Sequence, residues 1–425
     1  MARIVLNTFG SFGDLHPYLA IAIELRRRGH RPLIGTSEVY RAKVQAEGIE
    51  FAPVRPNVGD LLERPDLLEK LWHPERGTEY LIRDYLMPQV EESYQDLLAA
   101  SNGADLLLTH FAAYAGATVA EVLKMPWLSI ALQPSIFLSA DDPPVLPPLW
   151  LRHLYPLGRP VTVALFAMGK LRVRRWARPL FQLRRRLRLS TAANPVFEGQ
   201  YSPFGTLALF SQSFAKPQTD WPSNVTVCGF VFYDRRGEGF DGQDANNHLE
   251  QFLREGPAPV VFTLGSSAVM HPGDFYRESL RAAQFLGIRA VLLAGIKERD
   301  HLPGNLPASI LVAEYAPYSQ ILPHAALTVH QGGIGTTAQA LRAGHPTIVV
   351  PWSHDQPDNA ERLRKLGVSR TIPRSRYRAK LVAHEIENLL NDARVKQRAA
   401  ELGSKIAAED GLDRACDAIE SVLRT

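Results

Sequence analysis

The sequence predicts an α/β protein with two domains, each built on a parallel sheet that helices cover. The chain has 425 residues, which is more than one hydrophobic core normally serves. Short apolar runs alternate with helical stretches in both halves. A polar segment that contains Pro217 and Pro222 separates the two halves. Two such domains joined by one linker leave a cleft between them, which is a usual place for a ligand.

The first half starts with a short β-rich run at residues 2–8, followed by a Gly/Ser turn and by helical periodicity over residues 15–28. Later apolar runs predict further strands, with one helix among them. The strands are expected at 32–36, 105–109, 127–132 and 207–210, and the helix at 117–124. A proline-rich segment at 138–160 interrupts the pattern, and residues 160–190 are expected to be helical and strongly basic.

In the second half the alternation restarts, and amphipathic helices close the chain over residues 381–424. Strands are expected at 259–264, 289–294, 310–313, 326–329 and 347–350, and a helix at 274–285. We therefore expect an N-terminal domain over 1–215, a linker over 216–245, a C-terminal domain over 246–400 and a final helical segment over 401–425.

The stretch from His330 to Glu361 carries the clearest chemical signal. Three glycines and two threonines follow an apolar strand and lead into a helical stretch; a second strand then leads to a polar loop with Asp355 and Gln356. A glycine-rich turn at a helix N-terminus makes an anion site from backbone N–H groups. Asp accepts from hydroxyls, and Gln both donates and accepts, which suits a sugar. The stretch predicts a nucleotide-sugar site, although a tight connection between two elements would need the same glycines.

Composition argues against several other classes of protein. Cys228 and Cys416 lie far apart, so a disulfide framework is not expected and a reducing compartment fits. Cys and His show no metal-ligand spacing, no apolar run approaches the length of a membrane span, and the N-terminus has no signal-peptide layout. We expect a cytoplasmic protein that needs no metal or other cofactor.

The spacing of the stretch from His330 resembles the donor-binding signature of the inverting, nucleotide-sugar-dependent glycosyltransferases with the GT-B fold, which are similar to the UDP-glycosyltransferases. That signature runs H-x-G-G-x-G-T, then A-L-x-x-G-x-P, then P-x-x-x-D-Q-x-x-N-A. The matching residues are His330, Gly332, Gly333, Gly335, Thr336, Ala340, Leu341, Gly344, Pro346, Pro351, Asp355, Gln356, Asn359 and Ala360. The segments 219–222, 315–323 and 354–363 are similar to a bacterial branch that includes the rhamnosyltransferase chain of rhamnolipid synthesis, near sterol, macrolide and glycopeptide glycosyltransferases.

The resemblance extends over nearly the whole chain and implies a GT-B fold. Two Rossmann-like domains would face each other across a cleft, and the last helix would cross back to the N-terminal, acceptor-binding domain. The residues it assigns to the nucleotide-sugar donor are Gly13, Ser266, Tyr315, Ala316, His330, Gly332, Gly333, Gly335, Thr336, Asp355 and Gln356. Tyr315 stands where relatives stack an aromatic ring on the nucleobase. Ala338 stands where relatives strict for UDP carry a ribose-binding Glu, so the choice between UDP and dTDP stays open.

The resemblance places the general base in the loop after the first strand. The bacterial branch carries G-S-x-G-D there, and the base position in this chain is Asp14. His110 stands where other members place an Asp that orients a catalytic His, so the two residues are expected to pair with roles exchanged. From the residues alone, Asp14 could instead cap the following helix. His110 could be a structural hydrogen-bonding residue, and His16 could be the base.

The leaving diphosphate is expected to be stabilised without a metal. The chain contains no D-x-D motif, which supplies the metal ligands in another glycosyltransferase class. Helix N-terminal N–H groups, Thr336 and His330 would take the place of the ion.

Residues 143–197 contain ten Arg, one Lys and no Asp or Glu, and in 171–189 the arginines alternate with apolar residues. This segment is either a solvated helical face or a peripheral contact with the anionic inner face of a membrane. Nucleic acid is not an expected partner, because no recognition motif accompanies the charge.

These observations predict an inverting O-glycosyltransferase. It would move a hexose from a donor of the UDP-glucose or dTDP/UDP-rhamnose type to a hydroxyl of a lipophilic phenolic, sterol, polyketide or hydroxy-lipid acceptor. A sugar-nucleotide epimerase on the same fold and a non-catalytic sugar-nucleotide-binding partner protein are the alternatives. A nicotinamide dehydrogenase fits poorly, because G-x-G-x-x-G is absent after the first strand.

Overall fold

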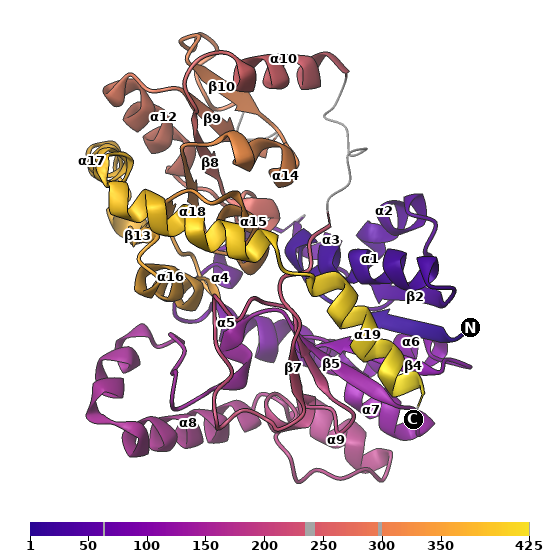
Figure 1. The fold of residues 1–425 in the computed structure, drawn as a ribbon. Coiled ribbons are helices and arrows are strands. Elements are labelled where there is room, and N and C mark those ends of the chain that lie inside the picture. The colour runs from indigo at the N-terminus through magenta and orange to yellow at the C-terminus, as the bar shows by residue number, and fades with distance from the viewer. Residues whose placement is uncertain (63, 234–242, 296–299, 425) are drawn as a thin grey trace. The chain divides into compact units, whose positions relative to one another are not determined.

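The computed structural model describes residues 1–425 except 63, 234–242, 296–299 and 425 (Figure 1). The chain divides into two compact units. The N-terminal unit comprises residues 1–233 and 409–425, and the C-terminal unit comprises residues 234–408. Each unit contains one parallel sheet with helices around it, so the predicted α/β class with two Rossmann-like domains is confirmed.

The N-terminal unit is built on a seven-stranded parallel sheet with the order β3-β2-β1-β4-β5-β6-β7. Its strands are β1 (Arg3–Asn7), β2 (Arg31–Thr36), β3 (Glu50–Pro53), β4 (Leu106–His110), β5 (Trp127–Ala131), β6 (Thr206–Ala208) and β7 (Val225–Val227). The central strands are continuous apolar runs because helices cover both faces of a parallel sheet. The strand order reverses between β1 and β4, and open α/β sheets bind ligands beyond the carboxyl ends of strands at such a point.

Helices and short helical turns connect these strands. They are α1 (Phe12–Arg27), η1 (Glu38–Tyr40), α2 (Arg41–Ala46), α3 (Gly59–Leu62), α4 (Pro65–Leu71), α5 (Gly77–Glu79), η2 (Tyr80–Leu86), η3 (Met87–Gln89), α6 (Val90–Ala100), α7 (Gly116–Leu123), η4 (Pro134–Phe137), η5 (Leu149–Leu157), α8 (Arg159–Arg174), α9 (Arg178–Arg186), η6 (Glu198–Gln200) and α19 (Gly411–Leu423). The last of these, α19, packs against α1. Arg28, at the end of α1, pairs with Asp413 and Asp417 of α19, each at 2.6 Å. The C-terminal helix thus belongs to the N-terminal unit.

The C-terminal unit is built on a six-stranded parallel sheet with the order β10-β9-β8-β11-β12-β13. Its strands are β8 (Val260–Thr263), β9 (Ala290–Leu293), β10 (Ile310–Ala313), β11 (Leu327–His330), β12 (Thr347–Val349) and β13 (Ser369–Thr371). Its helices are α10 (Gln243–Arg254), α11 (Gly265–Ala268), α12 (Phe275–Leu286), α14 (Tyr318–Ile321), η7 (Leu322–His324), α15 (Ile334–Ala343), α16 (Gln356–Lys365), η8 (Arg374–Arg376), α17 (Ala379–Asn391) and α18 (Ala393–Ala407). The strand order reverses between β8 and β11, and the glycine-rich turn follows β11.

A close glycine contact fixes α15, the helix after the glycine-rich turn. A Cβ on Gly403 of α18 would lie 2.5 Å from the Cα of Gly344, the residue that ends α15. Since no side chain fits between these backbones, α18 lies directly against α15. Packing against α18 therefore fixes the position of α15, whose N-terminus forms the predicted phosphate site.

The structure differs from the sequence-based expectations at several places. The sequence pattern missed β3, β7 and β13, which have three or four residues each and are edge strands of their sheets. One of them, β7, lies in the expected linker 216–245, of which 234–242 are outside the described residues. The chain changes unit after Tyr233 and again after Ala408. The expected loop at 265–267 forms the helical turn α11, and the polar loop after β12 is shorter than expected because α16 starts at Gln356.

Candidate active site

The loop between β1 and α1 holds the predicted general base. Ser11 is the N-cap of α1; its backbone N–H donates to Oδ2 of Asp14 at 2.7 Å, and its Oγ accepts from the N–H of Gly13 at 3.3 Å. This reciprocal capping fixes the Asp14 side chain at the helix start. Gly10 has a φ of +138°, and a Cβ there would lie 2.2 Å from Asp14 Oδ2, so only glycine fits. The loop therefore holds the carboxylate in one place.

Asp14 also faces His110, as the sequence predicts. His110 is the last residue of β4, which pairs with β1 in the sheet. Its Nε2 lies 3.9 Å from Asp14 Oδ1, an ion-pair distance that is too long for a hydrogen bond. The Asp14 side chain is 27% exposed and the His110 side chain 6% exposed. Asp14 thus combines the helix-capping role, which the sequence left open, with a position beside His110 that solvent can reach.

Burial decides the charge state of this pair. It raises the pKa of Asp14 above its ordinary value, while His110 and the hydrogen bonds from Ser11 oppose the rise. It lowers the pKa of His110, while the Asp14 charge and the Phe9 carbonyl oppose the fall. The lowered pKa favours the neutral form of the His110 imidazole, and the raised pKa makes Asp14 hold its proton to higher pH than an exposed Asp. Because its pKa is raised, this carboxylate is a stronger base than an ordinary exposed Asp.

His16, the alternative base, is less suited to the role. Its ring stacks on Phe12 with centroids 5.3 Å apart and lies 4.8 Å from the ring of Tyr233. Burial, with a smaller effect from Lys43, lowers the pKa of His16 to about 3. An imidazole with such a pKa is a weak base at neutral pH. The geometry and the charges therefore favour Asp14.

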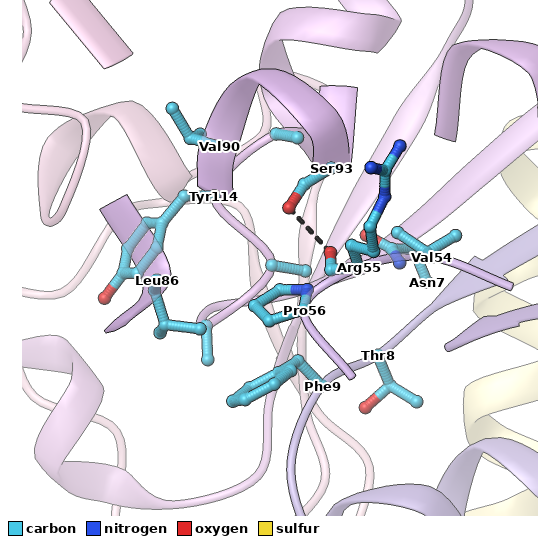
Figure 2. A pocket seen from close by; sticks show the side chains of 13 residues that line it. Asn7, Thr8, Phe9, Val54, Arg55, Pro56, Leu86, Val90, Ser93 and Tyr114 are labelled. Carbon is cyan, nitrogen blue, oxygen red and sulfur yellow. Dashed lines mark hydrogen bonds between the residues drawn. The ribbon is translucent and has the colours of Figure 1, made fainter. Parts of the chain in front are cut away.

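A pocket lies beside this loop, beyond the carboxyl ends of β1 and β4 (Figure 2). It measures about 370 Å³, including space open to solvent. Its apolar walls come from Phe9, Val54, Pro56, Leu86, Val90 and Tyr114. Ser93 Oγ donates to the Arg55 carbonyl at 2.6 Å, and the Arg55 guanidinium pairs with Asp96 at 2.8 Å (Figure 2 shows the first contact). Thr8 also lines the pocket and donates from Oγ1 to the Asp14 carbonyl at 3.3 Å, so the pocket wall is continuous with the base loop.

In the C-terminal unit, His330 ends β11 between Thr263 of β8 and Val349 of β12. Its side chain is fully buried, and burial lowers its pKa to about 3, so the imidazole is neutral. Nδ1 accepts from the N–H of Gly332 at 3.1 Å, which places the ring proton on Nε2. Within the described part of the chain, Nε2 has no hydrogen-bond partner. The ring therefore carries one unused N–H donor beside the glycine-rich turn.

The turn after His330 joins β11 to α15 with little side-chain bulk. Gly332 has a φ of +91°, and a Cβ there would lie 2.7 Å from Cγ1 of Val349. Gly333 is the N-cap of α15, and Gly335 and Thr336 follow in the first helical turn. The N–H groups of a first turn lack acceptors within the helix and lie at the positive end of its dipole. The turn thus has the geometry that the predicted anion site requires, and anion binding there stays a prediction.

Behind this turn lies a cluster of hydrogen-bonding side chains that the sequence reasoning missed. The Thr263 and Tyr318 hydroxyls lie 2.8 Å apart, and Gln331 Nε2 donates to Thr336 Oγ1 at 3.4 Å. Burial raises the pKa of Tyr318, while Thr263, Thr336 and the backbone of Gly265 oppose the rise. A Cβ on Gly265 would lie 2.3 Å from Gln331 Nε2. The hydrogen bond from Gln331 links the Thr336 hydroxyl to this cluster and fixes its position.

The sequence contained a signal for two members of this cluster. Tyr318 lies in the segment 315–323 and Gln331 in the donor signature, both used to recognise the family. Neither received a role, because the strand ends that bring them together are far apart in the chain.

The residues predicted to contact the sugar lie at the start of α16. Asp355 is the residue before this helix, and Asn359 Nδ2 donates both to Asp355 Oδ2 at 2.7 Å and to the Gly332 carbonyl at 2.9 Å. Asn359 thus ties the Asp355 loop to the glycine-rich turn. Gln356 differs from the expectation: it is 3% exposed, and its Oε1 accepts from the N–H of Trp352 at 2.8 Å. In this structure its amide oxygen closes the turn after β12.

The remaining predicted donor residues lie on neighbouring segments of the C-terminal unit. Ser266, on α11, is exposed, and Tyr315, after β10, is 42% exposed. Ala316 is buried, so only its backbone could meet a ligand. An exposed tyrosine ring beyond a strand end suits stacking on a planar base.

A search for groups of three or more His, Cys, Asp or Glu side chains that could hold a metal finds none among the residues that the structure describes. In the same residues, no helix is both long and apolar enough to cross a membrane.

Comparison with known proteins identifies the family. Residues 4–135 match the glycosyltransferase family 28 N-terminal domain, and residues 287–414 match the erythromycin biosynthesis protein CIII-like C-terminal domain. O-mycaminosyltylonolide 6-deoxyallosyltransferase of Streptomyces fradiae is 32% identical over 434 residues, covering 100% of this chain and 98% of the relative. Sterol 3-beta-glucosyltransferase of Leptosphaeria maculans is 26% identical over 439 residues, which cover 98% of this chain but 28% of that longer protein.

Solved structures show the same fold. A calicheamicin glycosyltransferase superposes with a TM-score of 0.69 at 20% identity, covering 100% of this chain and 98% of the other. A glycosyltransferase solved in complex with dTDP gives 0.69 at 19% identity, and a spinosyn rhamnosyltransferase gives 0.68 at 18%; each covers 100% of both chains. The resemblance drawn from the donor signature is thus confirmed. The chain belongs to the nucleotide-sugar-dependent glycosyltransferases with the GT-B fold.

Proposed function

We propose that the protein is an inverting O-glycosyltransferase that moves a hexose from a nucleotide sugar to a hydroxyl of a lipophilic small molecule. The observation that carries the proposal is the carboxylate of Asp14, which lies 3.9 Å from His110 at the end of a loop whose residues Thr8 and Phe9 line an apolar pocket. A base on a loop that borders an apolar pocket suits an acceptor that is apolar except at its reacting hydroxyl.

In the proposed reaction, Asp14 takes the proton of the acceptor hydroxyl as its oxygen attacks the anomeric carbon. The new C–O bond forms on the face opposite the diphosphate, and the bond to the diphosphate oxygen breaks, so the configuration inverts. The backbone N–H of Ser11 holds the carboxylate in position, and the His110 imidazole lies beside it. The N-terminal unit therefore supplies the base and the acceptor pocket.

The C-terminal unit supplies the donor site in this proposal. The first-turn N–H groups of α15, the Nε2–H of His330 and the hydroxyl of Thr336 would receive the negative charge that grows on the departing diphosphate. All three kinds of donor are neutral, and the helix dipole favours an anion at this end. We propose that transfer needs no metal ion.

The donor nucleotide is proposed to be dTDP or UDP. Two of the structurally similar glycosyltransferases were solved with thymidine diphosphate, and dTDP was bound in a third. The buried Ala338 offers no hydrogen-bonding side chain to a ribose, which removes one ground for preferring UDP. For the acceptor, one relative is named for O-mycaminosyltylonolide and another for sterols, which supports a large lipophilic alcohol.

We also propose that segment 143–197 brings the protein to anionic membrane surfaces. Ten of its residues are Arg and none is Asp or Glu. Co-sedimentation with vesicles should rise with the content of anionic lipid and fall with salt, because surface charges are screened over about 8 Å at physiological ionic strength. Equal binding to neutral and anionic vesicles would contradict this part of the proposal.

A panel of donors and acceptors tests the transferase directly. UDP and dTDP sugars are incubated with mixed macrolides, sterols, phenols and hydroxy-lipids, and the products are read by mass spectrometry. The expected result is one added hexose or deoxyhexose on an acceptor, together with free nucleoside diphosphate. Conversion of the donor to another sugar nucleotide without an acceptor would point to the epimerase. Tight nucleotide binding with no turnover would point to a binding protein.

A further inference from the structure

The helix α8 presents its apolar side to solvent, which reverses the usual arrangement of a surface helix. The exposed residues Pro160, Val163, Ala164, Ala167, Met168 and Leu171 recur at helical spacing and form one stripe. Met168 is 60% and Leu171 68% exposed, and Thr162 is the one buried residue of the helix. We call this stripe the α8 apolar face.

The preceding turn η5 continues this surface, and α9 shows the contrast. Trp150 and Leu157 of η5 are 57% and 67% exposed, and none of its residues is buried. In α9, which is richer in arginine than α8, Leu180, Phe181 and Leu183 are buried in the ordinary way. The exposure of apolar side chains is thus a property of η5 and α8 and does not follow from the basic composition alone.

The charge of segment 143–197, which contains α8, points to an anionic occupant. Five cations of the segment have acidic partners on other elements, through the pairs Arg159–Asp141, Lys170–Glu198, Arg172–Glu79, Arg184–Glu121 and Arg186–Glu91. Five exposed arginines have no ion pair within the described residues, namely Arg152, Arg175, Arg178, Arg185 and Arg188. A second copy of the chain seated on this face would bring the same unpaired positive charges together.

We infer that the α8 apolar face inserts into the headgroup layer of an anionic bilayer, with the helix lying parallel to the membrane plane. The inference rests on the proposed membrane contact of segment 143–197 and names how that contact is made. A helix of 16 residues extends about 24 Å, too short to span a bilayer core but suited to lie in the interface. Apolar side chains would enter the layer while the unpaired arginines meet lipid phosphates, so part of the binding should persist in high salt.

The double variant Met168→Gln/Leu171→Gln tests this inference. It removes apolar contact without adding charge, and both side chains are exposed, so the fold should be kept. Phe285→Gln is the matched control, because Phe285 is 71% exposed on α12 in the other unit. Flotation with phosphatidylcholine vesicles, with and without phosphatidylglycerol, is measured at low and high salt. The double variant should lose on the order of tenfold in binding to anionic vesicles, and nearly all of the salt-resistant part, while Phe285→Gln binds like the wild type.

Three outcomes would overturn the inference. The double variant could float as well as the wild type, or neither could bind vesicles at all. The wild type could instead dimerise in solution through this face, with the dimer lost in the double variant. Transfer to a water-soluble acceptor is measured in parallel and should be unchanged in the double variant. A protein that floats but shows no transfer would thus refute the proposed enzyme activity and leave the membrane inference standing.

Discussion

Replacing Asp14 by Asn gives the sharpest test of the proposed chemistry. Asn keeps the shape of the side chain and an oxygen for the 2.7 Å hydrogen bond from the Ser11 N–H, but it cannot take a proton. His110 and His16 are poor replacements, because burial lowers the pKa of both. We therefore expect the full effect of losing a general base, a fall in kcat of about a hundred- to ten-thousandfold. This range corresponds to roughly 3 to 5 kcal/mol in the activation barrier.

Stability should not account for such a fall. Burial raises the pKa of Asp14 in the folded protein above its ordinary value, so the protonated form is favoured there. The contribution of this group to stability is therefore fully present at low pH and is lost as the pH rises through the folded-state pKa. Asn is neutral at every pH and avoids that loss. The variant should therefore be at least as stable as the wild type near neutral pH.

The assay is turnover on an aliphatic alcohol acceptor across a pH series, with donor affinity and thermal unfolding measured on the same samples. In the wild type, kcat/KM should rise along an acid limb whose midpoint lies above the ordinary range of Asp, and this limb should vanish in Asp14→Asn. His110→Ala should cost less, and nothing further in the double variant. Near-full turnover by Asp14→Asn would refute the assignment. A nitrophenol acceptor would be a poor substrate for this test, because it ionises without help.

Four further predictions concern the donor site. His330→Ala should lower kcat about a hundredfold, the scale of losing one preorganised hydrogen-bond donor. An unchanged kcat would show that His330 Nε2 does not donate to the diphosphate. Tyr318→Phe should lower kcat with less effect on KM, because it removes the hydroxyl that bonds with Thr263 in the cluster behind Thr336 without touching the ligand. An intact kcat would mean that the cluster is only structural. Asp355→Ala should lower turnover of the sugar donor but leave the affinity for free nucleotide, measured by calorimetry, unchanged; a collapse of that affinity would contradict the placement of the sugar. Gln356→Ala should lower the free energy of unfolding by about 1–3 kcal/mol, because it leaves the buried N–H of Trp352 unpaired. Activity should survive EDTA, and loss with rescue by Mg²⁺ or Mn²⁺ would contradict a metal-free diphosphate site.

The central strands and the motifs at their ends could be predicted from the sequence, because these strands are strongly apolar and the motifs are local patterns. Asp14 and His110 follow two strands that become neighbours in the sheet, which brings them within 3.9 Å although they are far apart in the chain. The strand, glycine turn and helix at His330 are a local pattern, so their geometry could also be predicted. The strands β3, β7 and β13 were missed because three or four residues at a sheet edge bury too little to show a pattern.

Other features depend on packing that no local pattern encodes. Gln356 is buried because its side chain bonds with the backbone of Trp352, a contact set by the turn after β12. The hydroxyl cluster around Tyr318 and Thr336 needs three strand ends to meet. The helical character of residues 159–174 could be predicted, but the apolar side that α8 exposes could be recognised only once the elements that pack against it were known.

The anomeric configuration of the product tests the central claim most directly. The protein is incubated with an α-linked UDP or dTDP sugar of the gluco series and an alcohol acceptor, and the product is examined by proton NMR while the nucleotide is quantified. The account predicts a β-glycoside and an equal amount of free nucleoside diphosphate, with both lost together in Asp14→Asn. An α-glycoside, or consumption of the donor without any glycoside, would contradict it.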